Sequence, residues 1–211
     1  MQVRSRTPVN PGIVQWSGDN PGIYLKEDDD GDWRRLALYF NLALSPHGRG
    51  VAMLVLSEPD LSTGVEAGNL CITSNRPLMQ YLLTDFLAKF PTFRGRAALD
   101  ALPILDMDAH TSSGNPVPGG ECSEQLTSGD NRLTMTWRDI HEPFAVEVGP
   151  SESATGEHDM YAFFMEAGDA TIAVNGKPLS GHVVNRPFFG TTMSSAFLAM
   201  SETWVAPTEV D

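Results

Sequence analysis

The stretch LALYFNLALSPHGRGVAMLVL, residues 36–56, decides the fold class of this 211-residue chain. Its large side chains recur at every second residue from Leu36 to Leu44, which is the periodicity of a β-strand. The sequence Pro-His-Gly-Arg-Gly at residues 46–50 is typical of a turn, and a second apolar strand follows it. The stretch therefore predicts a buried β-hairpin. A helix over residues 33–44 is the alternative, because Leu and Ala are good helix formers.

Strand periodicity continues on both sides of this hairpin. Residues 132–138, 144–148 and 195–205 alternate between large apolar and small or polar side chains, and residues 69–74 and 161–165 are also expected to be strands. Asn175-Gly176 is a strong signal for a tight hairpin turn. Asn20-Pro21-Gly22, near the N-terminus, also has turn chemistry and predicts a meander of short strands there.

One segment has the periodicity of a helix instead. From Pro77 to Phe90 the apolar side chains form a stripe with i, i+4 spacing, and Pro91 is expected to end the helix. The sequence therefore predicts a β-rich α+β fold. It is expected to be an antiparallel β-barrel or a two-sheet sandwich with one main amphipathic helix over about residues 77–90. The length fits a single β-rich domain spanning residues 1–211.

The charge balance restricts the partners. Lys and Arg total 14 against 27 Asp and Glu, which gives a formal net charge of −13. Nucleic acids and anionic membrane surfaces require clustered basic residues, so neither is an expected partner. No apolar run is long enough to span a bilayer, and the N-terminal residues lack the apolar segment of a signal peptide. We therefore expect a cytoplasmic protein in which Cys71 and Cys122 are reduced.

Asp106-Met107-Asp108-Ala109-His110 is the most suggestive polar cluster in the sequence. On a strand, residues i, i+2 and i+4 share one face, so Asp106, Asp108 and His110 would point in the same direction. Two carboxylates and an imidazole are good ligands for Mn²⁺, Fe²⁺ or Zn²⁺. The same groups could act as an acid–base relay, in which an aspartate orients the histidine. The alternative is a strand face that is polar only because it meets water.

Glu202 is the second catalytic candidate. It is expected to share a strand face with Trp204 and with the apolar residues Ala196, Leu198 and Met200. If that face is buried, loss of solvent raises the pKa of the Glu202 carboxyl, as a general acid or base near neutral pH requires. Exposure of this face at the strand end, or pairing with an arginine, is the structural alternative.

Two further residues are candidates for ligand binding. Tyr39 and Asn41 lie on the face of the residue 36–44 strand that also carries the small residues Ala37 and Ala43. Hydrogen-bonding groups among small residues are typical of a ligand cavity. Contact with another strand or with the helix is the alternative.

The remaining polar residues give weaker signals. Arg186, in the turn Arg-Pro-Phe-Phe-Gly at residues 186–190, could bind an anionic substrate group, as could Arg94 and Arg96 after the helix. The other histidines lack metal-site spacing and are expected to be structural or exposed. They are His47, His141, His158 and His182.

These patterns favour one function and leave two alternatives. The leading expectation is binding, or cofactor-independent transformation of the lyase, isomerase or decarboxylase type, of a small hydrophobic organic molecule. Its cavity would lie between the sheet and the helix, with Tyr39, Asn41 and Trp204 binding the ligand and Glu202, or Asp108 and His110, transferring a proton. The first alternative is a metal-dependent enzyme that uses Asp106, Asp108 and His110. The second is a non-catalytic, homo-oligomeric interaction module, for which Phe188 and Phe189 would be the natural contact. No particular cofactor is indicated.

Overall fold

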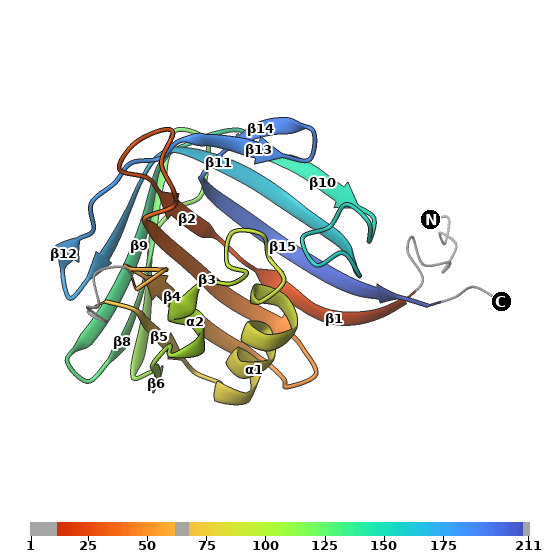
Figure 1. The fold of residues 1–211 in the computed structure, drawn as a ribbon, viewed down its shortest axis with the longest axis horizontal. Coiled ribbons are helices and arrows are strands. Elements are labelled where there is room, and N and C mark those ends of the chain that lie inside the picture. Colours follow the sequence, from red (N-terminus) through yellow and green to blue (C-terminus); the bar gives the residue numbers. More distant parts are fainter. Residues whose placement is uncertain (1–11, 62–67, 209–211) are drawn as a thin grey trace.

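The computed structural model describes residues 12–61 and 68–208, and it confirms a β-rich α+β fold (Figure 1). The expectation about a signal peptide concerns residues that lie largely outside this part of the chain. The sheet is not a closed barrel; it is a large, mainly antiparallel sheet that folds over in the manner of a sandwich. No helix in the described part of the chain is long and apolar enough to cross a membrane.

The first half of the sheet contains the hairpin from which the fold class was predicted. Its strands are β1 (Gly12–Asp19), β2 (Gly22–Leu25), β3 (Arg35–Leu44), β4 (Gly50–Leu56), β5 (Leu70–Thr73) and β6 (Ile104–Asp106). β3 and β4 pair antiparallel, as predicted, and the alternative of a helix over residues 33–44 is wrong. Among the strands that the structure describes, only β5 and β6 pair in parallel.

The second half of the sheet is built around two long strands. Its elements are β7 (Ala109–Gly114), β8 (Glu121–Ser128), β9 (Asn131–Ile140), β10 (Phe144–Val148), β11 (Asp159–Val174), β12 (Lys177–Pro178) and β15 (Ala196–Pro207). The first part of β11 pairs with β10 and β15, whereas its second part pairs with β9 and β12. β11 therefore connects the two halves. A separate hairpin, β13 (Asn185–Phe188) and β14 (Thr191–Ser194), lies beside the sheet.

The predicted helix exists but is not a regular α-helix throughout. Asn75 caps α1 (Arg76–Tyr81) by accepting a hydrogen bond from the Leu78 backbone N–H, and the chain continues into the π-helical turn η1 (Leu82–Leu87). A short helix, α2 (Ala97–Asp100), follows. Figure 1 shows α1 and α2 covering one face of the sheet near β3–β5.

The sheet separates two hydrophobic cores. Alternate residues of β3 enter different cores, because successive side chains of a strand point to opposite faces. Leu36 and Leu38 belong to the helix-side core, which includes Trp16, Phe86 and Trp204. Ala37 and Tyr39 belong to the second core, between the two halves of the sheet, with residues of β8, β9 and the second part of β11. Cys71 is buried in the helix-side core and Cys122 is partly exposed, and both are free.

The turn predicted at Asn20-Pro21-Gly22 is wrong, because the chain does not reverse there. β1 and β2 both run antiparallel to β3 and β15, so they are two parts of one interrupted strand. Proline lacks the N–H that a central strand needs, which explains the interruption at Pro21. The break leaves Asn20 buried, with its backbone N–H donating to the carbonyl of Ala199 on β15.

β15 has an irregularity at the same level. Ser201 has a φ of 52°, and the register to β11 shifts here, so that Ser201 and Glu202 together lie opposite Ala162. An extra residue of this kind is a β-bulge, and it reverses which face the following residues occupy. The prediction that Glu202 and Trp204 share a face with Ala196, Leu198 and Met200 is therefore wrong. Trp204 enters the helix-side core, whereas Ala196 and Leu198 enter the other core.

Candidate functional site

A cavity of about 360 Å³ opens on the helix-bearing face of the sheet, over β2, β11 and β15. We call it the aromatic cavity. Of the predicted helix segment only Phe90 lines it, so it lies beside the helix. Its other walls come from the loop before β11 and from the β13 hairpin. The rings around it are Tyr24, Trp33, Phe90, Phe164, Phe188, Phe189, Phe197 and Trp204.

The rings hold one another in place. Tyr24 makes edge-to-face contacts with Phe197 at 5.5 Å and with Trp33 at 5.8 Å between ring centroids. Phe90 stacks on Trp204 at 5.4 Å. These separations lie in the range preferred by aromatic pairs. The wall is therefore well packed, apolar and suited to flat ligands.

Glu202 is an ionisable group in this apolar wall. Its side chain is buried, and burial raises its pKa from 4.5 to about 7, while hydrogen bonding by Trp204 and Asn20 acts in the opposite direction. The Trp204 indole N–H donates to Glu202 Oε1. The carboxyl group therefore exchanges its proton near neutral pH, which is the property that a general acid or base needs.

Asn20 accompanies Glu202 in the cavity wall and was not foreseen as a site residue. Its side chain is only 3% exposed, and its Oδ1 atom accepts no hydrogen bond from the described residues. A buried amide oxygen without a donor costs about 1–3 kcal/mol. A ligand that donates a hydrogen bond here would remove this cost. No sequence pattern indicated this role, because Asn20 enters the cavity only through the break between β1 and β2.

Arg186 is the cationic side chain of the cavity, and its guanidinium lies among aromatic rings. Its guanidinium carbon is 5.1 Å from the centroid of the Phe197 ring and 5.4 Å from the rings of Tyr24 and Phe188. Burial lowers the pKa of its guanidinium, although nearby Tyr24 and Glu166 act against this. Its Nε atom is buried and has no hydrogen-bond partner in the described part of the chain.

On the other face of the sheet, Tyr39, Ser112 and Glu124 line a smaller cavity of about 140 Å³ that we call the polar cleft, and His110 lies beside it. The Tyr39 hydroxyl lies 3.1 Å from His110 Nε2, and the same nitrogen lies 2.6 Å from Glu124 Oε2. Ser112 donates to Glu124 Oε2 at 2.7 Å. Burial, followed by the charge of Glu124, raises the pKa of the Tyr39 hydroxyl well above its usual range. These four groups therefore form one cluster at hydrogen-bonding distances.

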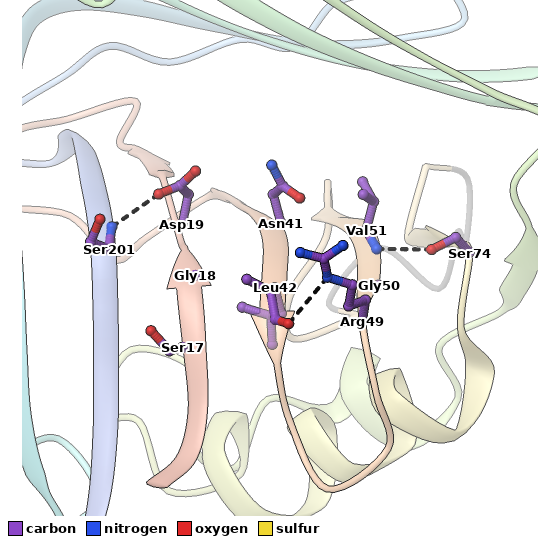
Figure 2. Close-up of a pocket in the computed structure, with 11 residues that line it drawn as sticks. Ser17, Gly18, Asp19, Asn41, Leu42, Arg49, Gly50, Val51, Ser74 and Ser201 are labelled. Atoms are coloured by element: carbon purple, nitrogen blue, oxygen red, sulfur yellow. Dashed lines mark hydrogen bonds between the residues drawn. The ribbon is translucent and has the colours of Figure 1, made fainter.

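Asn41 also borders the polar cleft, but it is exposed and lies at the edge of a second, open depression. Figure 2 shows this depression, with Asp19 and Asn41 on neighbouring strands. Asp19 Oδ1 accepts a hydrogen bond from the backbone N–H of Ser201 at 2.9 Å, which fixes the bulge of β15 (Figure 2). Tyr39 and Asn41 thus lie on the opposite side of the sheet from Glu202 and Trp204, and the two pairs cannot bind one small ligand together.

The expected face of Asp106, Asp108 and His110 does not form. β6 ends at Asp106 and β7 begins at Ala109, so the three residues do not share one strand. Asp106 pairs with Arg76 at 2.6 Å, and Asp108 Oδ2 accepts a hydrogen bond from the Gly129 backbone N–H. Within residues 12–61 and 68–208, no group of three or more His, Cys, Asp or Glu side chains is placed to hold a metal ion. The actual acidic partner of His110 is Glu124, which only the β7–β8 pairing brings near it.

Among the other histidines, His158 is structural and not exposed. It is buried against Phe86 and Trp204, and its Nδ1 lies 2.9 Å from Thr155 Oγ1. Burial, followed by the charge of Lys89, lowers its pKa. His158 therefore acts as an apolar packing residue behind the cavity wall.

Comparison of the chain with protein-family models, with curated protein sequences and with solved structures found no match. The functional argument therefore rests on the geometry of the aromatic cavity.

Proposed function

We propose that this protein binds a small, flat, hydrophobic organic molecule in the aromatic cavity, and that Glu202 exchanges a proton with it. The observation that carries the proposal is a buried carboxyl group with a pKa of about 7 in a cavity walled by eight aromatic rings. Ligand cavities typically combine an apolar lining with a few polar groups that fix orientation. Here the polar groups are Glu202, Asn20 and Arg186.

Proton exchange gives the site a route to cofactor-independent chemistry. In its neutral form Glu202 donates a proton to a ligand oxygen or accepts a hydrogen bond; in its ionised form it removes a proton from an acidic position of the ligand. A carboxyl group whose pKa lies near the ambient pH performs both steps at comparable rates. This is the requirement for an isomerase or a lyase that acts through proton transfer.

The two alternative functions have less support. The residues proposed for a metal site are dispersed, with Asp106 and Asp108 held by Arg76 and Gly129. For an interaction module, Phe188 and Phe189 were expected to be exposed contacts. Phe189 is 42% exposed, whereas Phe188 packs against Phe164 at 5.1 Å, and both residues line the cavity.

The proposal is tested by titration with N-phenyl-1-naphthylamine, a neutral fluorophore that brightens in apolar sites. We expect saturable binding of one molecule per chain. Ala154→Phe, which fills the cavity from its loop wall, should weaken this binding at least about tenfold, the effect of losing roughly 1.4 kcal/mol. Ala43→Phe, at an exposed position beside the depression of Figure 2, is the matched control and should bind as the wild type does.

Absence of saturable binding, or equal binding by both variants, would contradict the proposal. The role of Glu202 is tested with the same fluorophore. Binding should weaken as the pH rises through about 7, because the ligand would bury an ionised carboxylate, and Glu202→Gln should remove this dependence.

A further inference from the structure

Arg186 is a cationic side chain of the aromatic cavity that makes no direct polar contact with the described residues. No ion pair or hydrogen bond joins its guanidinium to any residue in 12–61 or 68–208, although it lines the aromatic cavity. Glu166 is near enough to favour the charged guanidinium, but it makes no ion pair or hydrogen bond with it, and its Oε1 accepts a hydrogen bond from the Ser194 backbone N–H at 2.6 Å. Arg186 is half-buried, and its Nε is a buried donor without a partner among the described residues, so this arrangement requires an explanation.

The surrounding aromatic rings supply only part of the stabilisation that the Arg186 guanidinium needs. Tyr24, Phe188 and Phe197 lie within 5.4 Å of the guanidinium and attract its positive charge. A ring face does not supply the lone pairs that the guanidinium N–H groups need. An arginine has five N–H donors, and two of them can donate parallel hydrogen bonds to the two oxygens of a carboxylate.

We propose that the ligand of the aromatic cavity is a planar hydrophobic acid whose carboxylate pairs with Arg186. This inference rests on the function proposed above and specifies the class of its ligand. The ring system of the acid would lie against the aromatic wall. Its uncharged polar end would face Asn20 and Glu202.

The preference for an anionic ligand is confined to the cavity, because the chain as a whole is acidic. The chain as a whole has a net charge of −13, which disfavours anions everywhere else on its surface. Glu202 and the exposed Glu152 are the acidic residues that line the cavity. Because the pKa of Glu202 is about 7, it is largely neutral in slightly acidic solution and repels an anion little.

The experiment compares two fluorophores that differ by one anionic group, at pH 6. 8-Anilinonaphthalene-1-sulfonate carries a sulfonate in place of a carboxylate, and N-phenyl-1-naphthylamine is the same ring system without it. We expect the wild type to bind the sulfonate at least about tenfold more tightly. Arg186→Met should abolish this preference, so that the two compounds bind with similar affinity, whereas Arg186→Lys should keep part of the preference.

A second measurement uses the unaltered protein, in case an Arg186 variant fails to fold. 1-Naphthoate and 1-naphthamide compete for the bound neutral fluorophore, and the carboxylate should displace it at a concentration at least about tenfold lower. Equal displacement, or a preference that persists in folded Arg186→Met, would overturn the inference while leaving the proposed function intact. If no fluorophore binds the wild type, or if Ala154→Phe has no effect, the proposed function itself fails.

Discussion

The aromatic cavity and the polar cleft lie on opposite faces of one sheet, and both contain ionisable side chains. In the polar cleft, Tyr39, His110, Glu124 and Ser112 contact one another at hydrogen-bonding distances. In the aromatic cavity, Asn20 Oδ1 and Arg186 Nε have no partners among the described residues.

This difference separates a structural cluster from a candidate binding site. Polar groups that bond to one another stabilise the contact between two strands and need no ligand. Buried polar groups without partners cost free energy, which a protein recovers when a ligand supplies the missing groups. The aromatic cavity is therefore the stronger candidate, although the histidine and the Asp-x-Asp sequence drew attention to the other face.

The largest expected effect concerns the stability that the wall of the aromatic cavity contributes. Trp204 is 2% exposed and contacts Trp16, Phe86 and Phe90. Trp204→Ala should lower the free energy of unfolding by about 3–5 kcal/mol, as for other large buried side chains. Urea denaturation measures this. Trp33→Ala is the control, because Trp33 is only partly buried and should cost clearly less; equal losses would mean that the cavity wall is not part of the core.

The second effect depends on pH. The pKa of Glu202 is about 7 in the folded protein against 4.5 for an exposed glutamate, so the folded state holds its proton more tightly. The contribution of the Glu202 proton to the free energy of unfolding is then fully present below about pH 4.5, and it is lost as the pH rises to about 7. Glu202→Gln should match the wild type near pH 4.5 and exceed it at pH 8 by about 2–3 kcal/mol.

Denaturation of both proteins at the two pH values measures this difference. If the Glu202→Gln variant is less stable than the wild type at pH 8, then Glu202 is compensated by a partner and is not simply desolvated.

The third effect concerns the bulge that places Glu202 and Trp204 on the cavity face. Ser201 has a positive φ, which a β-branched residue adopts only with strain. Ser201→Val should therefore lower the free energy of unfolding by about 1–2 kcal/mol and weaken binding in the aromatic cavity. Ser201→Gly should be close to neutral. If the valine variant is as stable and binds as well as the glycine variant, the bulge does not determine the site.

The smallest effect tests whether the two regions are independent. Tyr39→Phe removes the hydroxyl that contacts His110 and should cost about 0.5–1.5 kcal/mol, the usual contribution of one hydrogen bond. Binding of N-phenyl-1-naphthylamine should be unchanged, because Tyr39 faces away from the aromatic cavity. A change in its affinity would instead show coupling across the sheet.

Much of the fold was predictable because burial imposes a period of two on strands. The β3–β4 hairpin and the strands predicted over residues 132–138 and 144–148 follow from that rule. The Asn175-Gly176 turn follows from its residue types. The helix was predicted from its i, i+4 stripe, and it ends at Leu87, before the expected Phe90. Glu202 and Trp204 were identified as an acid and a ring in apolar surroundings, which the cavity contains.

Other features depended on how distant strands pair. The alternation across residues 195–205 was extended through Ser201, where one extra residue reverses the faces. Asp106, Asp108 and His110 were assigned to one strand, although the chain breaks between β6 and β7. A local pattern contains no information on where such breaks occur, because their cause is the pairing partner.

By itself, the sequence determined a β-rich fold with one amphipathic helix, and a net charge that disfavours nucleic acids. Hydrophobic periodicity is a property of neighbouring residues, so it can be recognised from the sequence alone. Only the tertiary structure decided that Asn20, Glu202 and Arg186 share one cavity while Tyr39 and His110 lie across the sheet from them. Residues 20, 186 and 202 come together through the pairing of β1 and β2 with β15 and through the position of the β13 hairpin. Those contacts span most of the chain, and they form because burying the aromatic rings of distant segments requires it.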